Sequence, residues 1–173
     1  MLSQKTRYAL RALLHLVERG QGAVGEGAGP GRGRPIQIGE IAETQRVPRK
    51  YLELIMLDLK KAGIVLSQRG PGGGYRLARD PAEISFAEVI RTMDGPIALV
   101  PCASLNFYQR CGDCHDEASC AIRKVMARVR SDAVRVLAGT SLADAAGMET
   151  SGAEEDEEAD DGVAAAPRDA SAA

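Results

Sequence analysis

Two helical patterns separated by only three residues dominate the first half of this 173-residue chain. The shorter pattern starts at Ile38 and ends near Gln45, and the longer one has Pro48 in its first turn and stops at Gly63. A short helix, a three-residue turn and a longer helix form the helix-turn-helix pattern. The apolar residues of the longer helix share one face, and they are Leu52, Ile55, Met56, Leu59 and Ala62.

A hairpin pattern follows the second of these helices without a gap. Residues 64–68 are apolar and β-branched, residues 69–74 contain four glycines and predict a turn, and residues 75–77 predict a short returning strand. The turn has an arginine on each side, and its glycines allow close approach to a phosphate backbone. A hairpin in this place predicts the wing of a winged helix.

Three further helices complete the predicted fold. One covers residues 3–18, a second begins after the Ser85–Glu88 capping box and ends at Gly95, and the last covers about 121–137. The last helix has an apolar seam typical of a dimer contact, made of Ile122, Met126, Val129, Ala133 and Val136. The sequence therefore predicts a mainly α fold with a small β-hairpin: a winged helix-turn-helix plus a long C-terminal dimerisation helix.

Charge divides the chain into a basic head and an acidic tail. Residues 1–79 contain 14 Lys and Arg against 6 Asp and Glu, whereas residues 149–173 contain 1 against 9. The tail lacks apolar periodicity, so we expect it to be disordered and to serve solubility or to compete with nucleic acid for the basic head. We expect a DNA-binding domain at 1–80 with a flexible Gly-rich loop at 20–35, a cysteine-loop and dimerisation region at 81–145, and a disordered tail at 146–173.

Positive charge gathers on the parts of this fold that would face DNA. The turn and the start of the longer helix meet base edges in a helix-turn-helix, and the wing and the start of the first helix can reach phosphates. One exposed cation usually only solvates a helix, but the group is typical of nucleic-acid binding. Lys60 and Lys61 suit the helix dipole instead. The candidate DNA contacts are Gln4, Lys5, Arg7, Arg46, Arg49, Lys50, Tyr51, Arg69, Gly72, Gly73 and Arg76. Gln37, before the shorter helix, is a poorer cap than Ser or Thr, at a cost of about 1 kcal/mol.

All four cysteines of the chain fall within one window of 19 residues, at Cys102, Cys111, Cys114 and Cys120. No apolar leader opens the chain, and it is large enough to fold without disulfides, so we expect a cytoplasmic protein with metal-binding thiols. The spacing contains only one close pair and leaves zinc and an iron–sulfur cluster open. A thioredoxin-like redox pair is disfavoured because no strand precedes Cys111.

The order of these motifs resembles the IscR-like family of bacterial winged-helix regulators over roughly residues 1–145. The resemblance rests on three segments, MLSQKTRYALRALLHL, IGEIAETQRVPRKYLELIMLDLKKAGIV and RGPGGGYRLARDPAEISFAEVIRTMDGP, followed by a cysteine loop and a long helix. It implies a dimeric transcription factor of a family in which many members sense iron–sulfur status, iron, nitric oxide or redox state through a bound cluster.

The resemblance also implies a set of cluster ligands. Three cysteines typically hold the family's cluster, the last two separated by five residues, which makes Cys102, Cys114 and Cys120 the expected ligands. In one subgroup a histidine three positions after the last cysteine completes a 2Fe-2S site, and here that position is Arg123. The candidates for the open fourth position are Cys111, His115, a residue of the partner's first helix and, more remotely, His15.

Together these features predict a homodimer that binds a double-stranded DNA operator and holds a 2Fe-2S or 4Fe-4S cluster, with zinc the weaker choice. The alternative is a cluster-free regulator of sulfur or cysteine metabolism that uses the loop as a zinc or thiol switch. No enzyme is expected, because there is no nucleophile–base arrangement and the glycines at 70–74 precede a strand, not a helix. No membrane segment is expected, and the sequence does not specify a contact with RNA polymerase.

Overall fold

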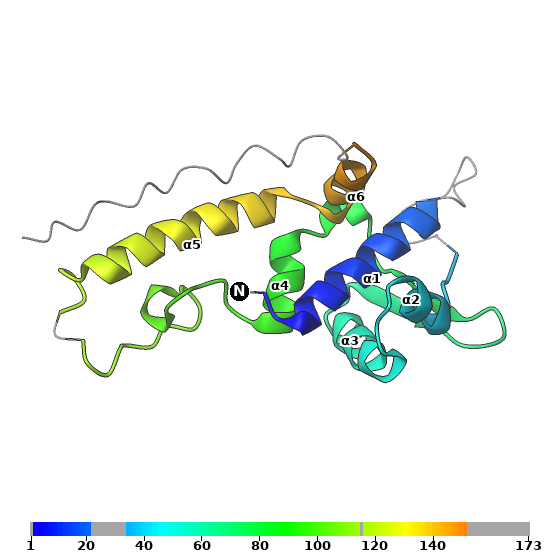
Figure 1. The fold of residues 1–173 in the computed structure, drawn as a ribbon, viewed down its shortest axis with the longest axis horizontal. Coiled ribbons are helices and arrows are strands. Elements are labelled where there is room, and N and C mark those ends of the chain that lie inside the picture. The colour runs from blue at the N-terminus through cyan, green and yellow to red at the C-terminus, as the bar shows by residue number, and fades with distance from the viewer. Residues whose placement is uncertain (1, 22–33, 115, 152–173) are drawn as a thin grey trace, which may run out of the picture.

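The structure is a computed structural model that describes residues 2–21, 34–114 and 116–151 (Figure 1). Most helices gather in one domain, from which a long helix and the cysteine loop extend to one side. Most of the predicted loop at 20–35 and most of the predicted tail at 146–173 lie outside the described residues.

The predicted helix-turn-helix is present. A short turn joins α2 (Ile38–Thr44) to α3 (Arg49–Lys61), and Arg46 in that turn has a left-handed backbone with φ of 51°. Gly63, just after α3, has φ of 72°, which glycine adopts at a helix end without strain. Gln37 precedes α2 and makes no side-chain cap hydrogen bond, as expected of a poor cap.

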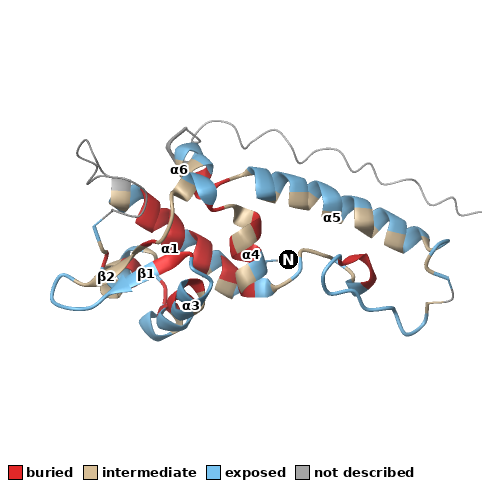
Figure 2. Ribbon diagram, turned by 180° about the vertical axis from the view of Figure 1, so that it is seen from behind, coloured by how far each residue is buried: buried red, intermediate tan, exposed pale blue. Residues whose placement is uncertain are grey.

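One hydrophobic core lies between α1 (Gln4–Gln21), the helix-turn-helix and α4 (Phe86–Asp94) (Figure 2). The predicted apolar face of α3 points into it, except that Ala62 is exposed at the end of the helix. The buried residues of α3 are Leu52, Ile55, Met56 and Leu59.

The predicted capping box at the start of α4 forms only in part. Ser85 Oγ accepts a hydrogen bond from the Glu88 backbone N–H at 3.2 Å, as an N-cap does. The Glu88 carboxylate does not return to the Ser85 backbone, because it binds the guanidinium of Arg79. Gly95 ends the helix with φ of 83°.

The predicted wing is an antiparallel hairpin of β1 (Val65–Gln68) and β2 (Gly74–Leu77). The sequence did not predict that Ile36 also pairs with this hairpin, at Tyr75 of β2. Ile36 and Tyr75 exchange two backbone hydrogen bonds of 2.8 Å each. The chain before α2 therefore lies along the outer edge of β2 and fixes the wing to the helix-turn-helix.

A helix that the sequence analysis did not predict, α6 (Leu142–Ser151), packs on α1 and on the short helix η1 (Pro81–Glu83). The predicted disorder is therefore wrong for residues 146–151. Leu142 and Ala145 are buried in the common core, which anchors the helix. Since Leu142 belongs to the same core as α3, that core extends well past the expected domain boundary at residue 80.

The long helix α5 (Ala121–Gly139) leaves this domain and contacts α4 and the short helix η2 (Pro101–Ala103). All of its residues are described, and none of them is buried (Figure 2). Among the described helices, none is both long and apolar enough to cross a lipid bilayer.

Candidate functional site

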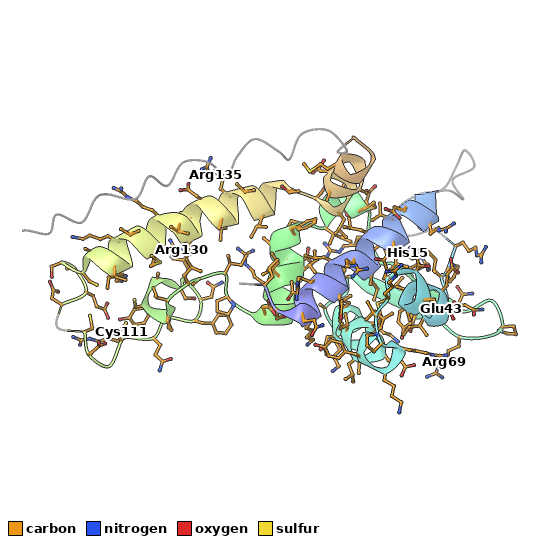
Figure 3. The ribbon with its side chains drawn as sticks, viewed as in Figure 1. His15, Glu43, Arg69, Cys111, Arg130 and Arg135 are labelled. Carbon is orange, nitrogen blue, oxygen red and sulfur yellow. The ribbon has the colours of Figure 1, made fainter. Side chains whose placement is uncertain are left out.

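A groove lies between the start of α2, one side of α3 and the wing. Three cations line it, Arg49 and Lys60 from α3 and Arg69 from the turn of the hairpin. Figure 3 shows Arg69 at the wing end of the molecule. Cations held beside a wing suit a phosphate backbone. The remaining lining residues are Gln37, Ile38, Gly39, Ser67, Gln68, Gly73, Gly74 and Tyr75.

Lys60 is a groove residue that the dipole interpretation missed. Its Nζ donates a hydrogen bond of 2.7 Å to Ser67 Oγ on the wing. Arg49 lies on the same side of α3, paired with Glu53 at 3.3 Å in an exposed ion pair that is easily opened. Arg49 and Lys60 are 11 residues apart, which is about three helical turns, so they lie on the same side of α3. This spacing is the sequence signal by which Lys60 could have been assigned to the groove.

The glycines of the wing are required for different reasons. A Cβ at Gly74 would lie 2.3 Å from the carbonyl oxygen of Ile36, and a Cβ at Gly73 would lie 2.4 Å from that of Gln68. The packing of the hairpin therefore explains both glycines. A Cβ at Gly72 would meet nothing within 4 Å, so Gly72 remains the candidate for close approach to a phosphate.

Five other predicted DNA contacts lie at the surface or away from the groove. Arg7, Arg46 and Lys50 are exposed, and the exposed Gln4 donates to Tyr8 Oη at 2.8 Å. Arg76 pairs in register with Leu66, and the next pair of the hairpin is Ser67 with Tyr75. Arg76 is not among the residues that line the groove.

Lys5 and Tyr51 have partners inside the fold. Lys5 Nζ lies 2.7 Å from Asp58 Oδ2, and this hydrogen bond, with the charges of Lys5 and Lys61, holds the pKa of Asp58 below its usual value. The rings of Tyr51 and Tyr8 meet edge to face, with centroids 6.0 Å apart. The packing of α1 on α3 explains both residues, and their contact with DNA stays a prediction.

Two arginines fasten the cysteine loop to α5. Arg123 Nε donates to the carbonyl oxygen of Cys102 at 3.2 Å, and Arg130 Nη1 donates to that of Ala103 at 2.6 Å. Cys102 is buried in η2, and Cys120 directly precedes α5. Arg123, at the position where the resemblance suggests a histidine, therefore holds the backbone of the loop.

The four cysteines are free thiols. A hydrogen bond between Cys111 and Cys102 raises the pKa of Cys111, and desolvation and then the charges of Cys102, Asp113 and Cys120 act in the same direction. Cys114 donates its backbone N–H to the carbonyl oxygen of Cys111 at 3.3 Å, one turn along the loop. Within the described residues, which omit His115, no three potential ligands are arranged to hold a metal ion. Thiol donors suit a soft metal or a cluster, but the described residues do not form a closed site.

An apolar stripe on α5 faces away from the rest of the molecule. Its path differs from the predicted seam, since Met126 and Ala133 are only half-exposed and Val125 joins the stripe. The bonds of Arg123 and Arg130 to η2 turn the opposite side of α5 toward the cysteine loop. The stripe residues are 43% to 66% exposed, and they are Ile122, Val125, Val129 and Val136.

His15 is buried beside the helix-turn-helix. It is 2% exposed, its Nδ1 lies 3.5 Å from Gln45 Nε2, and its Nε2 has no partner among the described residues. Burial, and then the charge of Arg19, lowers the pKa of His15, against the opposing effect of Glu40. His15 and Cys111 lie in different parts of the molecule (Figure 3), so the His15 side chain does not approach the cysteine loop of its own chain.

Comparison of the sequence with known proteins gives consistent matches. The Rrf2 family, described as an iron-dependent transcriptional regulator, matches residues 2–147. An rrf2-like HTH-type transcriptional regulator of Rhodobacter capsulatus is 47% identical over 131 residues, which is 75% of this chain and 81% of that protein. The transcriptional regulator IscR of Vibrio vulnificus is 35% identical over 119 residues, which is 69% of this chain and 61% of that protein. These relatives are transcriptional regulators and not enzymes.

Solved structures give the same result. CymR, the global cysteine regulator of B. subtilis, superposes with a TM-score of 0.65 at 31% identity, over 85% of this chain and 96% of that chain. IscR of T. potens superposes with a TM-score of 0.61 at 28% identity, over 84% of this chain and 85% of that chain. The predicted family resemblance and the predicted fold class are therefore confirmed.

Proposed function

This chain belongs to the Rrf2 family of transcriptional regulators, and we propose that it binds a double-stranded DNA operator as a homodimer whose affinity depends on an iron–sulfur cluster in the cysteine loop. The observation that carries the DNA-binding part is the groove in which Arg49, Lys60 and Arg69 come together from α3 and the wing. Cations in these places neutralise phosphates while the start of α3 meets base edges in the major groove.

The exposed apolar stripe of α5 supports the homodimer. Contiguous apolar surface of this kind is costly in water, and a second copy of the same helix offers a complementary stripe. Pairing of two such helices would place two copies of α3 at a fixed separation. The matching operator then has two related half-sites about one helical turn apart, or a multiple of that distance.

The proposed cluster ligands are the thiolates of Cys102, Cys114 and Cys120. Cys111 is proposed for the fourth position, because its thiol already interacts with that of Cys102. A cluster bound there supplies a centre that responds to iron and to oxidants, and the description of the family as iron-dependent supports this choice over zinc.

Packed helices connect the cysteine loop to the DNA-binding surface. Arg123 and Arg130 tie η2 to α5, α5 contacts α4, and α4 contacts both α1 and α3. A change in the conformation of the loop would therefore act on the position of α3. Coupling free energies between sites are typically about 1–3 kcal/mol, which corresponds to a change in DNA affinity of about 5-fold to 150-fold.

The cluster-free alternative is a thiol or zinc switch in the same loop. The hydrogen bond between Cys111 and Cys102 favours it, because these two thiols are close partners without any metal. Among the structural neighbours are the cysteine regulator CymR and an oxidised form of CymR from Staphylococcus aureus, which superposes with a TM-score of 0.59 at 28% identity. In this alternative, oxidation of the thiols replaces cluster chemistry as the signal.

Metal analysis of the full chain purified without oxygen separates the two functions. We expect iron and acid-labile sulfide in comparable amounts with visible absorption, and loss of all three in Cys114→Ala and Cys120→Ala. Lys124→Ala, at an exposed position just after Cys120, is the control that should retain them. Zinc, or metal-free protein whose DNA affinity changes on oxidation, would establish the alternative. A protein with neither metal nor an oxidation effect would refute both.

The DNA-binding part is tested by salt dependence. Lys60→Ala should weaken binding to duplex DNA and lower the slope of log affinity against log salt by about one, because one phosphate contact is lost. Lys124→Ala on α5 should leave both unchanged. Equal slopes for Lys60→Ala and wild type would remove the groove from the DNA interface.

A further inference from the structure

We propose that Leu54 and Leu57 of α3 read thymine methyl groups in the DNA major groove. The inference rests on the proposed DNA-binding function and adds two residues that discriminate between bases. Neither leucine serves the core of the protein, since their exposed fractions are 58% and 46%. Two large apolar side chains exposed one turn apart on the same helix are a feature that needs an explanation.

The two leucines lie at the centre of the outward side of α3. Residues spaced by 4, 7 and 11 positions share one line along an α-helix. Counted from Lys50, this line contains Leu54, Leu57 and Lys61, and it runs along the side of α3 opposite to the buried residues. The side of α3 that faces α1 holds Asp58, which pairs with Lys5. The outward line is therefore the part that would enter the major groove first.

The charges around the leucines select DNA as the occupant of this surface. Lys50 and Lys61 lie at the two ends of the line, and Arg49 and Lys60 border it on the side of the wing. The acidic residues of α3 form ion pairs, Glu53 with Arg49 and Asp58 with Lys5 and Lys61. These pairs are partly exposed, so phosphates can replace the carboxylates, and among the described residues Lys50 and Lys60 form no ion pair. An apolar protein partner would have to desolvate these cations, whereas DNA phosphates neutralise them and release counterions.

Thymine is the base that an apolar side chain can recognise in the major groove. It presents a C5-methyl group there, and Ala, Thr methyl or Phe contacts with it are a known form of direct readout. Burial of one methyl-sized group contributes about 0.8 kcal/mol, which is about fourfold in affinity. Each leucine that contacts one thymine should therefore contribute about that factor to sequence preference.

Deoxyuridine substitution tests the contact directly, because it removes the methyl group and retains the base pair. Sites are first selected from a randomised duplex library with the full-length wild-type chain at fixed salt. Each thymine of the selected site is then replaced by deoxyuridine, and affinities are measured for wild type, Leu54→Ala, Leu57→Ala and Leu99→Ala. Leu99 is 61% exposed and lies outside α3, so Leu99→Ala is the matched control.

We expect wild type and Leu99→Ala to lose about fourfold in affinity at one or more thymines, and Leu54→Ala or Leu57→Ala to be insensitive at the same positions. Thermal unfolding should agree among the four proteins, because the changed side chains are exposed. Equal sensitivity of all four proteins, or no deoxyuridine effect at any position, overturns the inference and leaves DNA binding intact. Failure of wild type to enrich any site over random duplex refutes the proposed function, and the inference with it.

Discussion

Replacing Gly74 with alanine should detach the outer edge of the wing from the chain that leads into α2. A Cβ at this position would lie 2.3 Å from the carbonyl oxygen of Ile36 and 2.5 Å from its carbonyl carbon. Both are backbone atoms, so the clash cannot be relieved by rotation of a side chain. The chain around Ile36 must therefore move away from β2. The paired hydrogen bonds between Ile36 and Tyr75, each 2.8 Å long, are then lost.

The size of the effect follows from these two bonds. A backbone hydrogen bond contributes about 0.5–1.5 kcal/mol net, so losing two costs about 1–3 kcal/mol. Alanine restricts the unfolded chain and returns about 0.4–1 kcal/mol. The midpoints of these ranges give a net loss of about 1.3 kcal/mol, which for a chain of this size lowers Tm by roughly 3–5 °C.

Gly72→Ala is the matched control, two residues earlier in the turn that leads into β2. Its Cβ would meet nothing within 4 Å, so its unfolding free energy should stay within about 0.5 kcal/mol of wild type. Denaturant unfolding of the three full-length proteins gives the stabilities, and amide exchange at Ile36 and Tyr75 locates the change. If Gly74→Ala unfolds like Gly72→Ala and keeps both amides protected, the proposed clash does not occur.

Three further predictions concern the helical part of the molecule. Burial lowers the pKa of His15 below 6.5 in the folded state, so the unfolded chain binds more protons and stability should fall as pH drops below about 6.5. His15→Gln should flatten the slope of unfolding free energy against pH between pH 5 and 7. Equal slopes for His15→Gln and wild type would count against this burial effect. Ser85→Ala removes the hydroxyl that accepts from the Glu88 N–H and should cost about 1 kcal/mol in urea unfolding; an unchanged midpoint would rule out the cap. Val129→Asp places a charge on the α5 stripe and should convert the proposed dimer into a monomer in sedimentation experiments, whereas an intact dimer would exclude the stripe as its interface.

The DNA-binding half of the fold was predictable because its signals are local. The three-residue turn between two helical patterns and the glycines after α3 determine the helix-turn-helix and the hairpin within 40 residues of chain. The apolar face of α3 follows from periodicity alone, and four of its five predicted residues are buried. The position of Arg46 in the turn required no knowledge of the tertiary structure.

Contacts between distant segments were not predictable in the same way. The pairing of Ile36 with Tyr75 joins segments 39 positions apart, and no pattern around Ile36 indicates a strand. The docking of α6 depends on Leu142 and Ala145 meeting a core built by earlier helices. A local signal for α6 did exist, since Ser141 and Asp144 have capping-box spacing and Ser141 Oγ accepts from the Asp144 N–H at 3.1 Å.

The contacts among the thiols of the cysteine loop were not predictable from their spacing. Spacing brings Cys102, Cys111, Cys114 and Cys120 into one loop, but it does not determine which thiols meet. In the structure Cys111 meets Cys102, and Arg123 holds the Cys102 backbone against α5. Residue type also does not determine the metal, since thiolates suit zinc and iron–sulfur clusters alike.

Control of DNA affinity by the cysteine loop can be measured on a single operator. The affinity of the full chain for one selected operator is measured without oxygen, before and after removal of iron from the same preparation, with Cys120→Ala in parallel. We expect a change of about 5-fold to 150-fold for wild type and none for Cys120→Ala. An iron-containing protein whose affinity stays the same after iron removal would contradict it.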